Sequence, residues 1–509
     1  MPYIYNHRSQ SISMPMTYPE FAAAHVDGVG TTGVILHVTI GERSHYGVYR
    51  HEFAHFASYN ATGLVEFHSL FFDYRLYLHQ RFMFFCLKQR GHPPTFPIIH
   101  ASSTFEPEVC SAFQAANEQV RAIEGYLFGY GTTKSVEELF DWRVQESFLR
   151  LTGDKIAMAH PNIHRTRMVY HQVLLTTDPD IAGDPKIMHP LVNDPANPEG
   201  PPLRLTSRAV LEAYAITIEV VAKYLKAIAL NPKGGLHPPV RFPARIDTVA
   251  LEACFDLWPE RTFTLEDFLA GQAPSEVYWC VSLVTYAAMM VPVVADPAGD
   301  TCVMGSLMQL SVAVRFVQFL DFIDKGTVRH PKETYEPMSH VDGGDPNPGI
   351  QRWLIDSQRA IGDPWSFKIG KRVANFVMSG GIENRDLVAA RRTQDQITKI
   401  ARCELYMEPH GFISEGGIWS NAAPNYLITS DKHVLVNMPD TDPDMAFLYY
   451  VNDSTLELLE AMADHRSWDI IWDRLAVADD RRKAAIAAVL FQMYGEDYLP
   501  DPGDLVLLF

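Results

Sequence analysis

The segment VYRHEFAHFA, residues 48–57, decides how this chain is interpreted. Its centre is HEFAH, which places His51 and His55 four residues apart. In an α-helix two such residues lie on the same face one turn apart, so both imidazoles can reach one metal ion. Glu52 then lies beside that ion, where its carboxylate can accept a proton from water. Between His51 and Ala57 there is no Gly, no Pro and no charged residue other than Glu52, which predicts a largely buried helix.

This segment resembles the active-site helix of the zincin metallopeptidases, whose pattern has Val or Thr three residues before the first histidine, here Val48. The resemblance implies a metalloprotease that binds Zn²⁺ through His51 and His55. It also implies that Glu52 is the general base in the hydrolysis of a peptide bond in a protein or peptide substrate. In the gluzincin group of zincins the third ligand is a glutamate on a downstream helix. The alternative is a buried helix whose histidines are hydrogen-bonded to their neighbours.

A second helix is predicted at residues 64–89, after a break at residues 60–63. If the chain reverses at the break, the returning helix brings Glu66 and Asp73 to either side of the histidine pair. Glu66 is therefore the predicted third zinc ligand, and Asp73 is the predicted partner that orients a histidine ring. Asp73, His79 or a remote residue are alternative ligands, and Glu66 could instead pair with an arginine. The seven-residue spacing of the two carboxylates departs from the gluzincin pattern, in which an acidic residue follows one turn after the ligand.

The hydrophobic pattern predicts an α+β protein that is predominantly α-helical. Residues 1–175 are predicted to form a zincin-like core of strand, HEFAH helix and returning helix, the strand being the β-rich run at residues 33–40. Residues 203–403 are predicted to form a helical domain, which is a candidate to complete the catalytic core. Residues 404–509 are predicted to form a β-meander at residues 411–438 and C-terminal helices.

Further helices are predicted from apolar periodicity. They lie at 107–125, 135–151, 207–230, 246–257, 277–293, 304–324, 365–379, 384–402, 443–463 and 479–494. Ser135 and Glu138 have the spacing of a capping box. The segment GYGTTKS at residues 129–135 is similar to a phosphate loop, but Thr133 stands at its Gly position and a helix precedes it. It therefore predicts a turn that leads into a capped helix.

Composition narrows the possible partners. A net charge of −18 with no basic cluster argues against nucleic-acid binding. The six cysteines are scattered singly, which favours reduced thiols and a cytoplasmic protein. No apolar run is long enough to predict a membrane span, and the N-terminal residues have no secretory pattern.

Two alternatives to a zinc peptidase follow from the same residues. A di-iron site would need a second Glu-x-x-His pair, and the other such pair, Glu42 and His45, falls in a predicted connection. The large helical remainder also fits a non-catalytic binding or regulatory protein with a structural or vestigial metal site.

Overall fold

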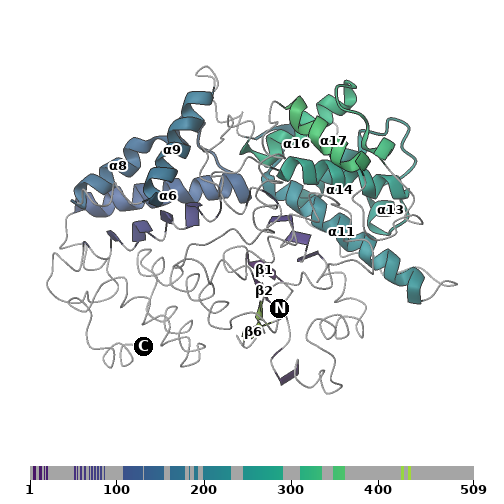
Figure 1. Ribbon diagram of the computed structural model, residues 1–509, viewed down its shortest axis with the longest axis horizontal. Coiled ribbons are helices and arrows are strands. Elements are labelled where there is room, and N and C mark those ends of the chain that lie inside the picture. The colour runs from purple at the N-terminus through teal and green to yellow at the C-terminus, as the bar shows by residue number, and fades with distance from the viewer. Residues whose placement is uncertain are drawn as a thin grey trace.

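Helices make up most of the chain that the computed structural model describes, and they form two groups that meet where α6 and α11 pack together (Figure 1). The described residues are 4–6, 11–13, 17, 19–20, individual positions within 51–85, 107–129, 131–153, 161–177, 183, 189–192, 199–230, 245–290, 310–334, 348–361, 426–428 and 434–436.

The first helical group begins with the long helix α6. Its members are α6 (Pro107–Phe128), α7 (Val136–Phe140), α8 (Trp142–Leu151) and α9 (Pro161–Thr176). Helix α6 packs against α7 and α8, and both of these contact α9. The predicted capping box is confirmed, because the Ser135 hydroxyl accepts from the Glu138 amide at 3.3 Å and the Glu138 carboxylate accepts from the Ser135 amide at 2.7 Å.

The turn between α6 and α7 requires glycine at position 131. Gly131 has φ of 96°, and a Cβ there would meet the His189 ring at 2.2 Å. The backbone amide of Thr132 donates to His189 Nε2 at 2.9 Å, which fixes the ring against the turn. The segment is thus a structural turn ahead of a capped helix, as predicted.

The second group is built around α11. Its members are α11 (Ser207–Leu230), α12 (Arg245–Phe255), α13 (Leu265–Leu269), α14 (Ser275–Met289), α16 (Val312–Asp324), the 3₁₀ helix η2 (Pro331–Thr334) and α17 (Pro348–Ala360). Helix α11 packs against α12, α14 and α16 and also contacts α6. None of the helices in the described ranges is long and apolar enough to span a bilayer.

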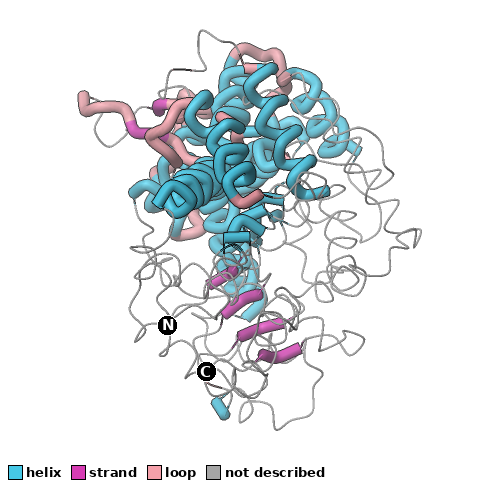
Figure 2. The backbone as a smooth tube through the Cα atoms, turned by 90° about the vertical axis from the view of Figure 1, so that its left-hand side faces the viewer, coloured by secondary structure: helices cyan, strands magenta, loops and turns pink. Residues whose placement is uncertain are grey.

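Six short strands complete the described structure. A four-stranded sheet has the order β1 (Ile4–Asn6), β2 (Ser11–Ser13), β5 (Tyr426–Ile428), β6 (Val434–Val436). The β2–β5 pair is parallel and the other two pairs are antiparallel, so two N-terminal strands share one sheet with two strands from residues 426–436 (Figure 2). A separate antiparallel pair joins β3 (Leu191–Val192) and β4 (Leu203–Arg204).

The prediction of a predominantly helical chain is confirmed for the described residues, and the predicted helix at 207–230 has the bounds of α11. Helices α9 and α17 were not predicted. Each begins at a proline, Pro161 or Pro348, which is favourable at the first position of a helix but is easily taken as a loop signal in sequence. Strands β5 and β6 pair within the segment predicted as a meander, and a meander itself stays a prediction. The predicted strand at 33–40 and the four predicted helices beyond residue 364 lie outside the described residues.

An aromatic cluster ties the HEFAH segment to its surroundings. The rings of Tyr59 and Tyr5 of β1 lie 6.2 Å apart, and Tyr59 also contacts His68 at 5.6 Å. Both Tyr59 and His68 contact Phe128, the last residue of α6. The cluster therefore connects β1, the HEFAH helix, the returning segment and α6 around one buried point.

Candidate metal centre

His51 and His55 project together from one helical turn. Residues 51, 52, 54 and 55 are helical, and Ala54 is fully buried. The two histidine side chains are partly buried, at 14% and 16% exposure, and their Nε2 atoms lie 3.2 Å apart. The predicted convergence of the two imidazoles is what the helix produces.

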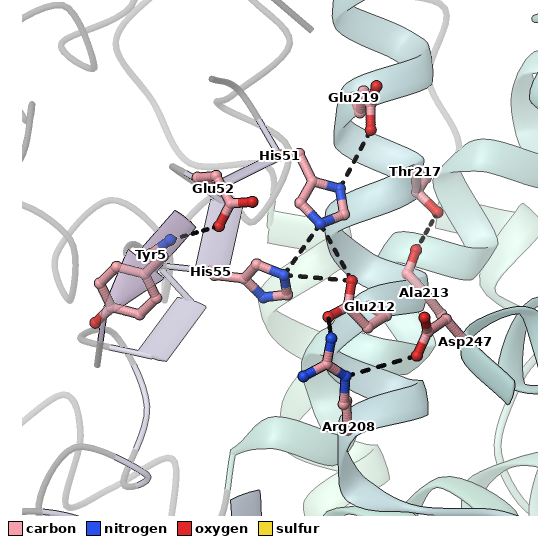
Figure 3. A network of polar contacts seen from close by, with 10 residues as sticks. All are labelled: Tyr5, His51, Glu52, His55, Arg208, Glu212, Ala213, Thr217, Glu219 and Asp247. Atoms are coloured by element: carbon pink, nitrogen blue, oxygen red, sulfur yellow. Dashed lines mark hydrogen bonds and ion pairs between the residues drawn. The ribbon is translucent and has the colours of Figure 1, made fainter. Parts of the chain in front are cut away.

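The third member of the cluster is Glu212 of α11. Its Oε2 lies 3.1 Å from His51 Nε2 and 3.5 Å from His55 Nε2 (Figure 3). The start of α11 is held firmly, because the Thr206 hydroxyl accepts from the Ala209 amide at 3.2 Å and the Ser207 hydroxyl donates to the α6 carbonyl of Tyr126 at 3.2 Å. Glu212 lies little more than one turn beyond this anchored end, so a fixed helix determines its position and no loop intervenes.

The three donor atoms have the spacing that a zinc ion requires. Zinc is bound by histidine nitrogen and carboxylate oxygen at about 2.0 to 2.2 Å, and the edge of a tetrahedron of that radius is about 3.3 to 3.6 Å. The observed separations of 3.1, 3.2 and 3.5 Å come close to this edge. Among the residues that the structure describes, the cluster contains three His, Cys, Asp or Glu donors and no fourth. Three protein ligands with one open position are typical of catalytic zinc, whereas structural zinc usually has four.

A second carboxylate on α11 faces the other nitrogen of His51. Glu219 Oε2 lies 3.2 Å from His51 Nδ1, and its side chain is 9% exposed. A carboxylate in this position favours a proton on Nδ1, so Nε2 is the nitrogen that would give up its proton to bind a metal ion between His55 and Glu212. Seven residues separate the two glutamates along α11, which is two helical turns and places them on one face.

The site attracts positive charge. Burial by itself lowers the pKa of His51, but hydrogen bonding to Glu212 and Glu219 and the nearby charge of Glu52 outweigh it and raise the pKa to about 10. For Glu212 burial acts to raise the pKa, and the imidazoles of His55 and His51 lower it well below its ordinary value. Carboxylates thus dominate the field at the point between the two rings, where a divalent cation would be favoured.

Glu52 stands on the same helical turn as the two histidines. Its Oε2 accepts a hydrogen bond from the backbone amide of Tyr5 at 2.7 Å (Figure 3). This short bond orients the carboxylate. Among the strands that the structure describes, β1 is the first in the order of its sheet, so within that part of the chain an edge strand lies beside Glu52.

The structure brings together three of the predicted site residues, His51, Glu52 and His55. The predicted ligand Glu66 and its partner Asp73 lie outside the described residues, so their roles stay predictions, and in the described part of the chain the third donor is Glu212. His79 does not belong to the cluster. Its side chain is buried, its Nδ1 lies 2.9 Å from the Arg75 carbonyl, and burial lowers its pKa to about 3.

Sequence reasoning missed Glu212 and Glu219, although a signal for them was present. They are the two acidic residues of the largely apolar helix predicted at 207–230, whose other charged residues are Arg208, Lys223 and Lys226. Buried carboxylates on such a helix need a cation or several donors. The third ligand was instead predicted on residues 64–89, from the reversal of the chain at residues 60–63.

Comparison of the chain with protein-family models, curated proteins and solved structures finds no match.

Proposed function

We propose that this chain is a zinc-dependent metallopeptidase of the zincin type. The observation that carries the proposal is the triangle of His51 Nε2, His55 Nε2 and Glu212 Oε2, whose edges come close to those of a zinc tetrahedron. Glu52 on the same turn adds the base that a hydrolase needs. We therefore interpret the fold around the site as zincin-like, with an HExxH helix and a glutamate from a later helix.

The residues divide the work of hydrolysis. His51, His55 and Glu212 would hold the ion through their facing atoms. Bound zinc would lower the pKa of water in the open position and polarise the scissile carbonyl. Glu52 would take one proton as the water oxygen bonds to the carbonyl carbon, and would deliver that proton to the amine nitrogen as the C–N bond breaks. One water is consumed and one carboxylate and one amine are formed, so Glu52 ends the cycle ionised as it began.

A peptide is the proposed substrate because of strand β1. In zincins the edge of a sheet holds the peptide by strand addition. Here β1, at the edge of the sheet as far as its strands are described, contacts Glu52 through the Tyr5 amide. The charge of −18 argues against a polyanionic substrate. The gluzincin resemblance now rests on Glu212 with Glu219, whose separation of two turns still departs from the one-turn spacing of that group.

The test combines metal content with the loss of one base. Purified wild-type protein is expected to hold about one zinc per chain and to cleave casein or a mixed-sequence fluorogenic peptide library. The double variant His51→Ala/His55→Ala should lose the metal. Glu52→Gln should keep it and lose about 10²- to 10⁴-fold in kcat.

Glu118→Gln is the matched control, because it removes an exposed glutamate of α6 that lies outside the metal cluster. It should leave zinc content and kcat unchanged. Wild-type protein that holds no zinc, or a Glu52→Gln variant that hydrolyses as fast as wild type, would contradict the proposed mechanism. Zinc-loaded protein that cleaves neither substrate would instead favour a structural metal site in a binding protein.

A further inference from the structure

The two oxygens of the Glu212 carboxylate have different partners. Oε2 faces the histidine pair, at 3.1 Å from His51 Nε2 and 3.5 Å from His55 Nε2. Oε1 lies 3.3 Å from Nη2 of Arg208, which stands one turn earlier on α11 (Figure 3). The carboxylate is therefore shared between a guanidinium on one side and the metal position on the other.

Arg208 is itself held from a second helix. Its Nε lies 3.6 Å from Oδ1 of Asp247 on α12, a helix that packs against α11. Asp247 has a side-chain exposure of 15%, so this ion pair is partly shielded from water. The backbone amide of Arg208 also donates to the Gly129 carbonyl at 3.3 Å, which fixes the start of its helix. The guanidinium is thereby aimed at Glu212 from a fixed backbone.

We propose that Arg208 is a positioning residue that keeps Glu212 a one-oxygen zinc ligand, and that Asp247 holds Arg208 in place for this purpose. The inference rests on the proposed zinc site. A carboxylate can bind a metal through one oxygen or two, and an oxygen that accepts a charge-assisted hydrogen bond is less available to the metal. With Oε1 occupied by Arg208, the fourth position stays open for water, which catalysis requires.

An ordinary surface ion pair does not explain this arrangement as well. Exposed pairs four residues apart on a helix contribute little to stability. The Arg208 side chain is 39% exposed, but Glu212 is only 14% exposed and is shared with two histidines, so its orientation has consequences that a surface pair lacks. A purely structural role would change stability and leave the coordination of a bound metal unaltered.

Cobalt replaces zinc in such sites and reports its coordination number through its visible absorption. Wild-type protein loaded with Co²⁺ should show the strong bands of a four-coordinate ion. In Arg208→Met the molar absorptivity should fall by about half or more, because Glu212 then binds through both oxygens and the ion becomes five-coordinate. Arg208→Lys, which restores a cation toward Oε1, should recover a large part of the wild-type spectrum.

Two further variants make the result decisive. Arg143→Met removes an exposed arginine of α8 that pairs with Asp141, and the Co²⁺ spectrum of this variant should equal that of wild type. Asp247→Asn leaves Arg208 charged but weakens its anchor, so it should also lower the molar absorptivity of bound Co²⁺. This variant replaces Arg208→Met in the test if circular dichroism shows that Arg208→Met does not fold. If Arg208→Met, or Asp247→Asn in its place, binds cobalt with the wild-type spectrum, the positioning role of Arg208 is overturned and the zinc site is not. Wild-type protein that binds no cobalt would overturn the zinc site as well.

Discussion

Replacing Glu219 by glutamine isolates the effect of one buried charge on zinc affinity. Glu219 Oε2 lies 3.2 Å from His51 Nδ1 and its side chain is 9% exposed, so little water screens the pair. Removal of the partner of a zinc-binding histidine typically lowers metal affinity by about 10- to 100-fold. This loss corresponds to about 1.4 to 2.8 kcal/mol.

The assay is a competition titration of metal-free protein with zinc and a chromophoric chelator. Glu219→Gln should bind zinc about 10- to 100-fold more weakly than wild type, because glutamine retains an acceptor near Nδ1 but not the charge. Glu219→Ala should bind at least as weakly, and Glu118→Gln on the surface of α6 should match wild type. Affinity for zinc within about twofold of wild type in both Glu219 variants would refute the role of Glu219 in orienting His51.

Three further predictions address the base, a buried histidine and a helix cap. Tyr5→Pro removes the amide proton that Glu52 accepts, so kcat on peptides should fall about tenfold or more. Tyr5→Phe keeps both the amide and the ring and should retain kcat; equal kcat values for the two variants would count against this contact. His79 has a pKa of about 3 in the folded chain and an ordinary pKa of 6.5 in the unfolded chain. Between these two pH values the unfolded state binds more protons, so the free energy of unfolding falls as the pH drops from 6.5 toward 3. The slope from this residue approaches about 1.4 kcal/mol per pH unit, and urea unfolding of His79→Gln should show a correspondingly shallower pH dependence; identical slopes would show that His79 does not titrate this way. Ser135→Ala removes the α7 cap and should lower the free energy of unfolding by about 0.5 to 2 kcal/mol in urea titrations, and no change would mean that the cap does not contribute.

Local features were predictable from sequence because short-range physics determines them. The four-residue spacing of His51 and His55 places both rings on one helical face whatever surrounds the helix. The capping box at Ser135 and Glu138 requires a match over only four residues. The apolar periodicity of residues 207–230 likewise gave the bounds of α11.

The place of Glu212 beside the two histidines could not be derived in the same way. His51 and Glu212 are 161 residues apart in the chain, and their meeting depends on how α11 packs beside the HEFAH helix. No local period encodes that packing, so the search was confined to the nearest helix and selected Glu66. The sequence did show Glu212 and Glu219 as the two acidic residues of a largely apolar helix. That pattern indicates buried carboxylates but does not indicate their partner.

X-ray absorption spectroscopy at the zinc edge, combined with metal analysis of wild type and Glu212→Gln, tests the central claim most directly. The zinc site predicts about one zinc per chain with two imidazole nitrogens and one carboxylate oxygen at about 2.0 to 2.2 Å, and a fourth light atom from solvent. Glu212→Gln should lose the carboxylate contribution together with most of the metal. The assignment of His51, His55 and Glu212 as the metal centre would be contradicted by either of two results. One is a zinc spectrum that Glu212→Gln leaves unchanged, and the other is wild-type protein that contains no zinc.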